Sequence, residues 1–278
     1  MKRYGYFLAG LSILLFACTI SATATPQVLN TVPPATNTPT ATAAAPATPI
    51  SQTNATCTGV TLFLDPALAS GFNCQSVPEA SGASLPYFAI NPQYTEITLQ
   101  GYPLADRLIS PQINVFPVAR YTQILPDQVN PRVAALQSLI GGAAPGTAEL
   151  PFLPIENAVQ QDYVHFQVIP FANGSGARFI TQYAQFADPL NNHDMFYTFQ
   201  GLTSDGKYWV SVTLPVSNPT LPADGQNPPN GQSWDDFGKN FTKYITSITA
   251  QLNAQPPESF SPTIPMLDAL IASIRVQP

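Results

Sequence analysis

The chain has 278 residues, and only 9% of them are charged, whereas typical soluble domains carry about 25%. There are 16 acidic and 10 basic residues, which give a net charge of −6. This sparse acidic composition excludes nucleic acid as a predicted partner, because nucleic-acid binding requires clustered Lys and Arg side chains.

The first eighteen residues have the organisation of an export signal. Lys2-Arg3 precedes an apolar run of about 14 residues, which is shorter than the roughly 20 residues of a membrane-spanning helix. The run ends in Leu15-Phe16-Ala17-Cys18, which resembles a bacterial lipobox with an aliphatic residue three places before the cysteine. We therefore expect a signal peptide over residues 1–17 and lipidation of Cys18, palmitate included. The alternative is an ordinary secretory signal in which Cys18 is incidental.

Residues 18–56 are predicted to be a tether that begins at the lipidated cysteine. The segment is rich in Thr, Ala and Pro and contains no charged or aromatic residue. It cannot bury enough apolar surface to offset its conformational entropy, so we expect it to be disordered. Acyl chains on Cys18 would anchor the protein to a membrane. The expected localisation is the cell envelope, outside the cytoplasm.

The two remaining cysteines are predicted to form a disulfide bond. Cys57 and Cys74 enclose a loop of about 17 residues, which is worth on the order of 3 kcal/mol in the chain-entropy model. Exported domains are normally oxidised. Metal binding and a redox dithiol are the competing interpretations, but neither a second ligand pair nor a C-x-x-C spacing supports them.

The first regular elements of the globular part are two strands and a helix. Thr95–Gln100 alternates apolar and polar residues, and Ile113–Val118 is rich in strand-forming residues. Pro117 restricts this second strand to an edge or bulged position. A helix is predicted over Pro131–Ile140, with Asn130 as its N-cap and two glycines after its end.

Two β-hairpins are predicted in the centre of the chain. Asn173-Gly174-Ser175-Gly176 marks the first turn and Ser204-Asp205-Gly206 marks the second, because Asn, Asp and Gly tolerate positive φ. The four flanking strands form an antiparallel platform and are predicted over residues 163–170, 177–183, 195–202 and 207–214.

Two amphipathic helices are predicted near the C-terminus. Ser233 is the expected N-cap of the first, which carries Asp235 and Asp236 in its first turn and ends before Pro256. The second is predicted over Pro265–Ile274. Their apolar stripes are most simply contacts with the core.

Residues 57–278 are therefore predicted to form a single α+β domain, with an antiparallel sheet of about six strands and two or three helices packed on it. The order of elements and the closing segment Leu267-Asp268-Ala269-Leu270-Ile271-Ala272-Ser273-Ile274 resemble the Mog1/PsbP-like fold in the C-terminal half. This resemblance implies a terminal helix packed on an antiparallel sheet in an exported lipoprotein. It implies no site residue.

No residue set predicts catalysis, a metal site or a cofactor. His165 and His193 are the two histidines of the chain, and neither stands at a metal-ligand spacing from another ligand. The glycine-flanked Ser175 lies in a hairpin rather than in the strand-to-helix turn of a hydrolase. Asn191-Asn192-His193-Asp194 is interpreted as a polar loop rather than a catalytic dyad.

One weak ligand site is predicted from strand alternation. Side chains alternate between the two faces of a sheet, which places polar residues of both hairpins on one face. If the helices cover only the apolar face, this exposed face suits a polar ligand or a protein. The alternative is a solvated surface without function. The candidate residues are His165, Gln167, Arg178, Gln182, Gln200 and Trp209.

The leading functional prediction is a non-enzymatic, lipid-anchored envelope protein that binds a protein partner or a small polar ligand through this face. One alternative is a carboxylate-dependent hydrolase or carbohydrate-active enzyme that uses residues such as Asp188, Asp194 and Asp205. The other is a structural or assembly factor of an envelope complex.

Overall fold

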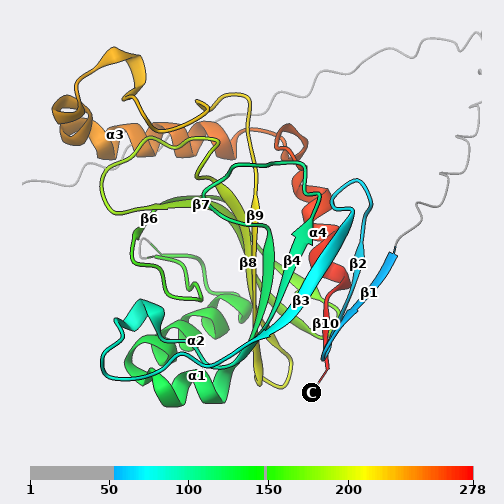
Figure 1. Ribbon diagram of the computed structural model, residues 1–278. Coiled ribbons are helices and arrows are strands. Elements are labelled where there is room, and N and C mark those ends of the chain that lie inside the picture. The colour runs from blue at the N-terminus through cyan, green and yellow to red at the C-terminus, as the bar shows by residue number, and fades with distance from the viewer. Residues whose placement is uncertain (1–52, 147–148, 278) are drawn as a thin grey trace, which may run out of the picture. The chain divides into compact units, whose positions relative to one another are not determined.

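The computed structural model describes residues 53–146 and 149–277, which belong to one compact unit. The predicted signal peptide, Cys18 and nearly all of the tether lie outside the described residues. The described part contains a seven-stranded sheet, a three-stranded sheet and four α-helices (Figure 1). The predicted α+β class is thereby confirmed. No helix in the described part is both long and apolar enough to cross a bilayer.

The main sheet is antiparallel throughout and contains both predicted hairpins. Its strand order is β3-β4-β5-β9-β8-β7-β6. The strands are β3 (Gly71–Val77), β4 (Tyr94–Gln100), β5 (Gln112–Pro117), β6 (Val159–Phe171), β7 (Gly174–Ala184), β8 (Phe196–Thr203) and β9 (Tyr208–Pro215).

Two details of these strands differ from the prediction. The first hairpin turns at Ala172 and Asn173, so Gly174, Ser175 and Gly176 of the predicted turn lie inside β7. A Cβ on Gly176 would stand 2.3 Å from the Gln200 carbonyl oxygen, so glycine is needed here for close strand packing. The prediction that Pro117 makes its strand an edge was wrong. β5 lies between β4 and β9, and Pro117 is tolerated because it is the last residue of the strand.

The three-stranded sheet was not predicted. It consists of β1 (Thr53–Cys57), β2 (Val60–Leu64) and β10 (Arg275–Val276), in the order β1-β2-β10. The disulfide between Cys57 and Cys74 is confirmed, with a Cα–Cα distance of 5.8 Å. It joins β1 of the small sheet to β3 of the main sheet.

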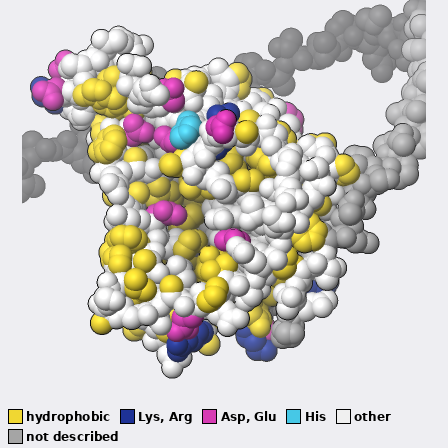
Figure 2. Space-filling view, in the orientation of Figure 1, with side chains coloured by type: hydrophobic (Ala, Val, Ile, Leu, Met, Phe, Trp, Pro, Cys, Tyr) yellow, Lys and Arg dark blue, Asp and Glu magenta, His cyan; other side chains and the backbone are white. Residues whose placement is uncertain are grey.

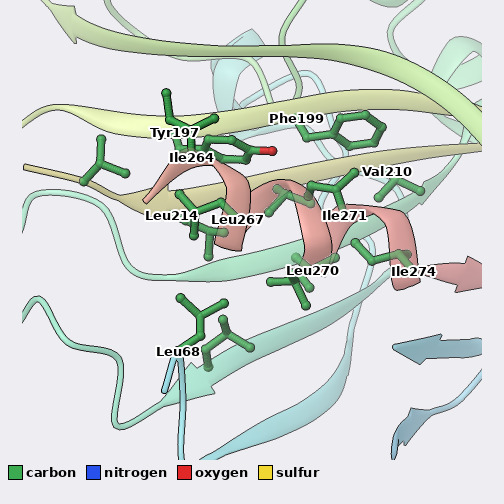
Figure 3. Close-up of a cluster of buried hydrophobic side chains, with 14 of the residues drawn as sticks. Leu68, Tyr197, Phe199, Val210, Leu214, Ile264, Leu267, Leu270, Ile271 and Ile274 are labelled. Atoms are coloured by element: carbon green, nitrogen blue, oxygen red, sulfur yellow. The ribbon is translucent and has the colours of Figure 1, made fainter. Parts of the chain in front are cut away.

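One face of the main sheet, here called the α4 face, is covered by two helices and by the small sheet. The helix α3 (Trp234–Asn253) begins at the predicted cap, where Ser233 Oγ accepts a hydrogen bond from Asp236 N. The helix α4 (Ile264–Ser273) is capped by Thr263. Figure 3 shows Leu267 and Ile271 of α4 close to strand residues such as Tyr197 and Val210. Because α4 also contacts β2, it is buried between the two sheets.

The opposite face, here called the α2 face, is covered by α1 (Val118–Ile124), α2 (Pro126–Ile140) and residues 149–155. The prediction that α2 starts at Pro131 was wrong. Pro126 occupies the first turn, where a missing N–H costs nothing. Pro131 lies inside the helix, which buries Val129, Leu136 and Leu139 against the sheet. Short 3₁₀ helices occur at Tyr87–Ala89, Pro229–Gly231 and Pro257–Ser259.

Candidate functional site

The structure divides the six predicted ligand-binding residues between the two faces of the main sheet. Both faces are covered, and four of the six side chains are buried: Arg178, Gln182, Gln200 and Trp209. The expected exposed polar face does not exist in this part of the molecule.

The pairing between the two hairpins explains this difference. Arg178 stands opposite Phe199, so the Arg178 side chain shares the α4 face with Phe199. Gln200 and Trp209 consequently lie on the α2 face. A bulge between Val164 and Gln167 also shifts the parity of β6, and His165 within it has a positive φ of 52°.

On the α4 face, the predicted residues hold helices to the sheet. His165 Nε2 lies 3.0 Å from the carbonyl oxygen of Leu252, near the end of α3. Arg178 donates hydrogen bonds to the His165 carbonyl and to Gln167 Oε1, and it forms an ion pair with Asp268 of α4. Burial lowers the pKa of His165. These contacts indicate structural roles.

On the α2 face, the Gln200 amide is fully engaged. Its oxygen accepts hydrogen bonds from Leu153 N at 3.1 Å and from Trp209 Nε1 at 2.8 Å. Its nitrogen donates to Thr198 and Ser211, both at 2.9 Å. A buried amide with four satisfied hydrogen bonds stabilises the fold and has no group left for a ligand.

Two of the three predicted carboxylates meet in a pocket of about 440 Å³, here called the acidic pocket. Asp205 lies elsewhere, in the β8–β9 turn, where Thr203 and Lys207 hold its pKa at about 2. The acidic pocket is lined by Phe186, Asp188, His193, Asp194, Asp224, Gly225 and Gln226. Figure 2 shows acidic side chains gathered beside a histidine on the face in view.

The loop between β7 and β8 builds this pocket around a buried amide. Asn191 donates a hydrogen bond to Asp194 Oδ2 at 2.9 Å and accepts hydrogen bonds from the backbone N–H groups of His193 and Asp194. Gln182 donates to Asp188 Oδ2 at 3.1 Å. Gly225 lets the opposite wall approach closely, because a Cβ there would stand 2.9 Å from Asp188 Oδ1.

The electrostatics of the acidic pocket favour proton exchange. Burial, and the charge of Asp194 to a smaller extent, raise the pKa of Asp188 to about 6. His193 Nδ1 lies 2.5 Å from Asp194 Oδ1. An acid that is partly protonated near neutral pH beside an ionisable pair has the elements of acid–base chemistry.

A second cavity of about 590 Å³ lies between the small sheet and the main sheet and is here called the inter-sheet cleft. Sequence reasoning missed it, because its walls come from segments that lie far apart in the chain. The lining residues are Thr58, Gly59, Val60, Ser76, Glu79, Gln93, Tyr94, Thr95, Val115, Pro117, Arg120, Tyr208, Val276 and Gln277.

One ion pair supplies the charge of the inter-sheet cleft. Arg120 Nε donates to Glu79 Oε2 at 2.7 Å, and Arg120 Nη2 donates to Glu79 Oε1 at 2.6 Å. This bidentate contact, with a further hydrogen bond from Ser81, holds the pKa of Glu79 at about 2. The two charges therefore cancel at any pH well above 2.

Comparison with known families and with curated proteins identifies no relative. Neither the models of known protein families nor the curated proteins contain a match to this chain. The resemblance to the Mog1/PsbP-like fold stays a prediction. Functional inference consequently rests on the geometry of the two cavities.

Among the described residues, no group of three or more His, Cys, Asp or Glu side chains is arranged to hold a metal ion. The candidate chemistry is ligand binding in the inter-sheet cleft or proton transfer in the acidic pocket.

Proposed function

We propose that the protein is a lipid-anchored, extracytoplasmic binding protein that takes a small polar ligand into the inter-sheet cleft. The observation that carries this proposal is the cleft of about 590 Å³, which falls within the range of about 300–1,000 Å³ typical of ligand pockets. Its polar wall supports a polar ligand. The ligand site thus differs from the sheet face expected from the sequence.

The anchor part of the proposal is supported by the N-terminal sequence and by the disulfide. The lipobox-like Leu15-Phe16-Ala17-Cys18 supports lipidation of Cys18. The Cys57–Cys74 bond supports an oxidising compartment. Labelling cells with a palmitate analogue should mark the protein, and Cys18→Ala should abolish the label. A label that persists in the Cys18→Ala variant would contradict lipidation at this residue.

Native mass spectrometry tests the binding part of the proposal. The full chain, purified from membranes in a detergent without a sugar head group, should carry a bound small molecule. Thr58→Trp places a large side chain at the exposed rim of the cleft and should remove the bound mass. Ser247→Trp is the matched control on the exposed side of α3 and should retain it. Equal ligand occupancy in the two variants would contradict binding in the cleft.

A carboxylate-dependent hydrolase is the second candidate function, and the raised pKa of Asp188 favours it. Asp188 would donate a proton in a pocket that also holds the His193–Asp194 pair. Turnover of chromogenic glycosides and esters is the test. Asp188→Asn keeps the hydrogen-bond acceptor for Gln182 and should lower any such turnover at least 100-fold. Turnover that survives this substitution would exclude Asp188 as the acid.

A further inference from the structure

The charge balance of the inter-sheet cleft restricts its ligand. Arg120 and Glu79 are its charged lining residues. Two guanidinium nitrogens of Arg120 bind Glu79, and the third, Nη1, donates to Gln123 Oε1 at 2.7 Å. Because these two charges neutralise each other, the lining has no net charge that would attract an ionic ligand. The cleft therefore favours a ligand without net charge.

The polar groups of the cleft suit a ligand rich in hydroxyl groups. Within the described part of the chain, no other residue forms a hydrogen bond with the side chains of Thr58, Thr95, Tyr208 or Gln277. Hydroxyl and amide groups both donate and accept hydrogen bonds. Sugar hydroxyls have the same dual capacity, so each of these groups can pair with one.

The remaining wall of the cleft is aromatic and aliphatic. The ring of Tyr208 packs against the buried side chains of the α4 face. Val60, Val115 and Val276 line the same space. A saccharide presents C–H groups between its hydroxyls, and such groups pack against tyrosine rings and valine side chains. A fully polar ligand such as an inorganic ion would leave this wall unused.

We propose that the ligand of the inter-sheet cleft is a neutral saccharide, and this inference rests on the proposed function. Free oligosaccharides and the chains of a glycan polymer share this chemistry. The hydroxyl and amide side chains bind the sugar hydroxyls, and the tyrosine and valine side chains contact the C–H faces of the rings.

The disulfide fixes the width of the cleft. Cys57 directly precedes Thr58 on one wall, and Cys74 lies two residues before Ser76 on the other. Gly59 has a positive φ of 73°, and its carbonyl oxygen accepts a hydrogen bond from Gln277 N at 2.7 Å. These bonds hold the walls in place before a ligand arrives, which lowers the entropic cost of binding.

Isothermal titration of the full chain in a polyoxyethylene detergent tests the inference. The neutral probes are cellotriose, maltotriose and N,N′,N″-triacetylchitotriose. Trigalacturonate is the acidic probe and triglucosamine is the cationic probe. At least one neutral trisaccharide should bind saturably with one molecule per chain. Both charged probes should bind at least 10-fold more weakly than the best neutral one. A charged probe that binds as tightly as the best neutral one would overturn the inference.

Two small substitutions locate the binding in the cleft. Tyr208→Phe and Gln277→Ala each remove hydrogen-bonding groups and should weaken binding about 3- to 10-fold, as expected for one lost hydrogen bond. Gln251→Ala, on the exposed side of α3 and outside the cleft, is the control and should change the affinity less than 2-fold. Saccharide binding that neither cleft variant weakens would overturn the assignment to this cleft.

Supplying the saccharide as a polymer separates the two possible sources. If a soluble glucan competes with the bound trisaccharide, the cleft can bind a chain of a polymer. If it does not compete, the cleft binds short oligosaccharides only. If no trisaccharide binds while native mass spectrometry still finds a ligand that Thr58→Trp removes, the ligand is not a saccharide, and the proposed binding function is still supported. If both experiments are negative, both proposals fall.

Discussion

The two cavities of this protein lie at opposite ends of the β8–β9 hairpin, and their linings differ in charge. Tyr208, at the start of β9, lines the inter-sheet cleft, whereas His193 and Asp194 of the acidic pocket precede β8. An eight-residue strand spans roughly 25 Å. In the inter-sheet cleft, Arg120 and Glu79 neutralise each other, whereas the acidic pocket is lined by several carboxylates.

This difference separates two kinds of pH behaviour. Because Arg120 holds the pKa of Glu79 at about 2, the charge of the cleft stays constant above about pH 3. The acidic pocket contains Asp188, with a pKa raised to about 6, and therefore changes its charge between about pH 5 and 7. The cleft suits constant binding, and the pocket suits a reaction or a response that depends on pH.

The largest expected effect comes from the disulfide, which belongs to the cleft side of the comparison. Replacing both cysteines (Cys57→Ser with Cys74→Ser) should destabilise the fold by about 3 kcal/mol. For a domain of this size, that loss lowers the melting temperature by roughly 6–12 °C. Differential scanning calorimetry measures it. The reduced wild type should melt like the double variant, and an unchanged melting temperature would show that the small sheet is held without the bond.

The acidic pocket should give an effect of intermediate size that depends on pH. A raised carboxyl pKa means that the folded state binds more protons than the unfolded state between about pH 4 and 6, so stability falls as pH rises through this range. Asp188→Asn removes this contribution. The variant should gain on the order of 1 kcal/mol at pH 7–8 and nothing near pH 4.

Urea unfolding at several pH values measures this change. Asp224→Asn removes a charge from the same pocket wall without contacting the Gln182–Asp188 pair, so its pH profile should match that of the wild type. Part of the decline should remain in Asp188→Asn, because burial also raises the pKa of Asp162 to about 6. A gain that is equal at pH 4 and pH 8 would contradict the assignment to Asp188.

Local signals in the sequence predicted the parts of the fold that depend on neighbouring residues. The hairpin turns follow from Asn173 and Gly206, and the start of α3 follows from Ser233. The Cys57–Cys74 bond followed from cysteine count and spacing. Each of these features is decided within about 20 residues of chain, where composition and periodicity carry the information.

The pairing between distant strands was not predictable in the same way. Eleven residues separate β7 from β8, so the turn geometry does not fix their register, and a shift of one residue moves every side chain to the other face. That uncertainty placed Gln200 and Trp209 on the wrong face. β10 has two residues, too few for any strand pattern.

The two cavities also differ in how far apart their lining residues lie in the chain. Asp188 and Asp194 lie six residues apart in the chain, so the sequence could bring them together, although it could not bring Asp224 to them. The inter-sheet cleft joins residues from 58 to 277. Its ion pair links Glu79 to Arg120 across 41 residues and has no recognisable motif.

The smallest expected effect tests whether charge pairing makes the cleft selective. Glu79→Gln leaves Arg120 uncompensated and changes the charge of the cleft from zero to +1. Affinity for a neutral trisaccharide should change less than about 3-fold. Affinity for trigalacturonate should rise about 5-fold, the effect of one charge interaction at about 4 Å in water.

Salt and a matched control separate this effect from a general change in net charge. Raising the ionic strength to about 1 M shortens the Debye length to about 3 Å, so it should remove the gain for trigalacturonate. Glu258→Gln makes the same charge change at an exposed position outside the cleft and should leave the affinity unchanged. A gain of equal size in both variants would mean that net charge, and not the Arg120–Glu79 pair, decides which ligands enter. Because the pair persists down to about pH 3, the wild-type preference for a neutral ligand should also be constant from pH 4 to 8.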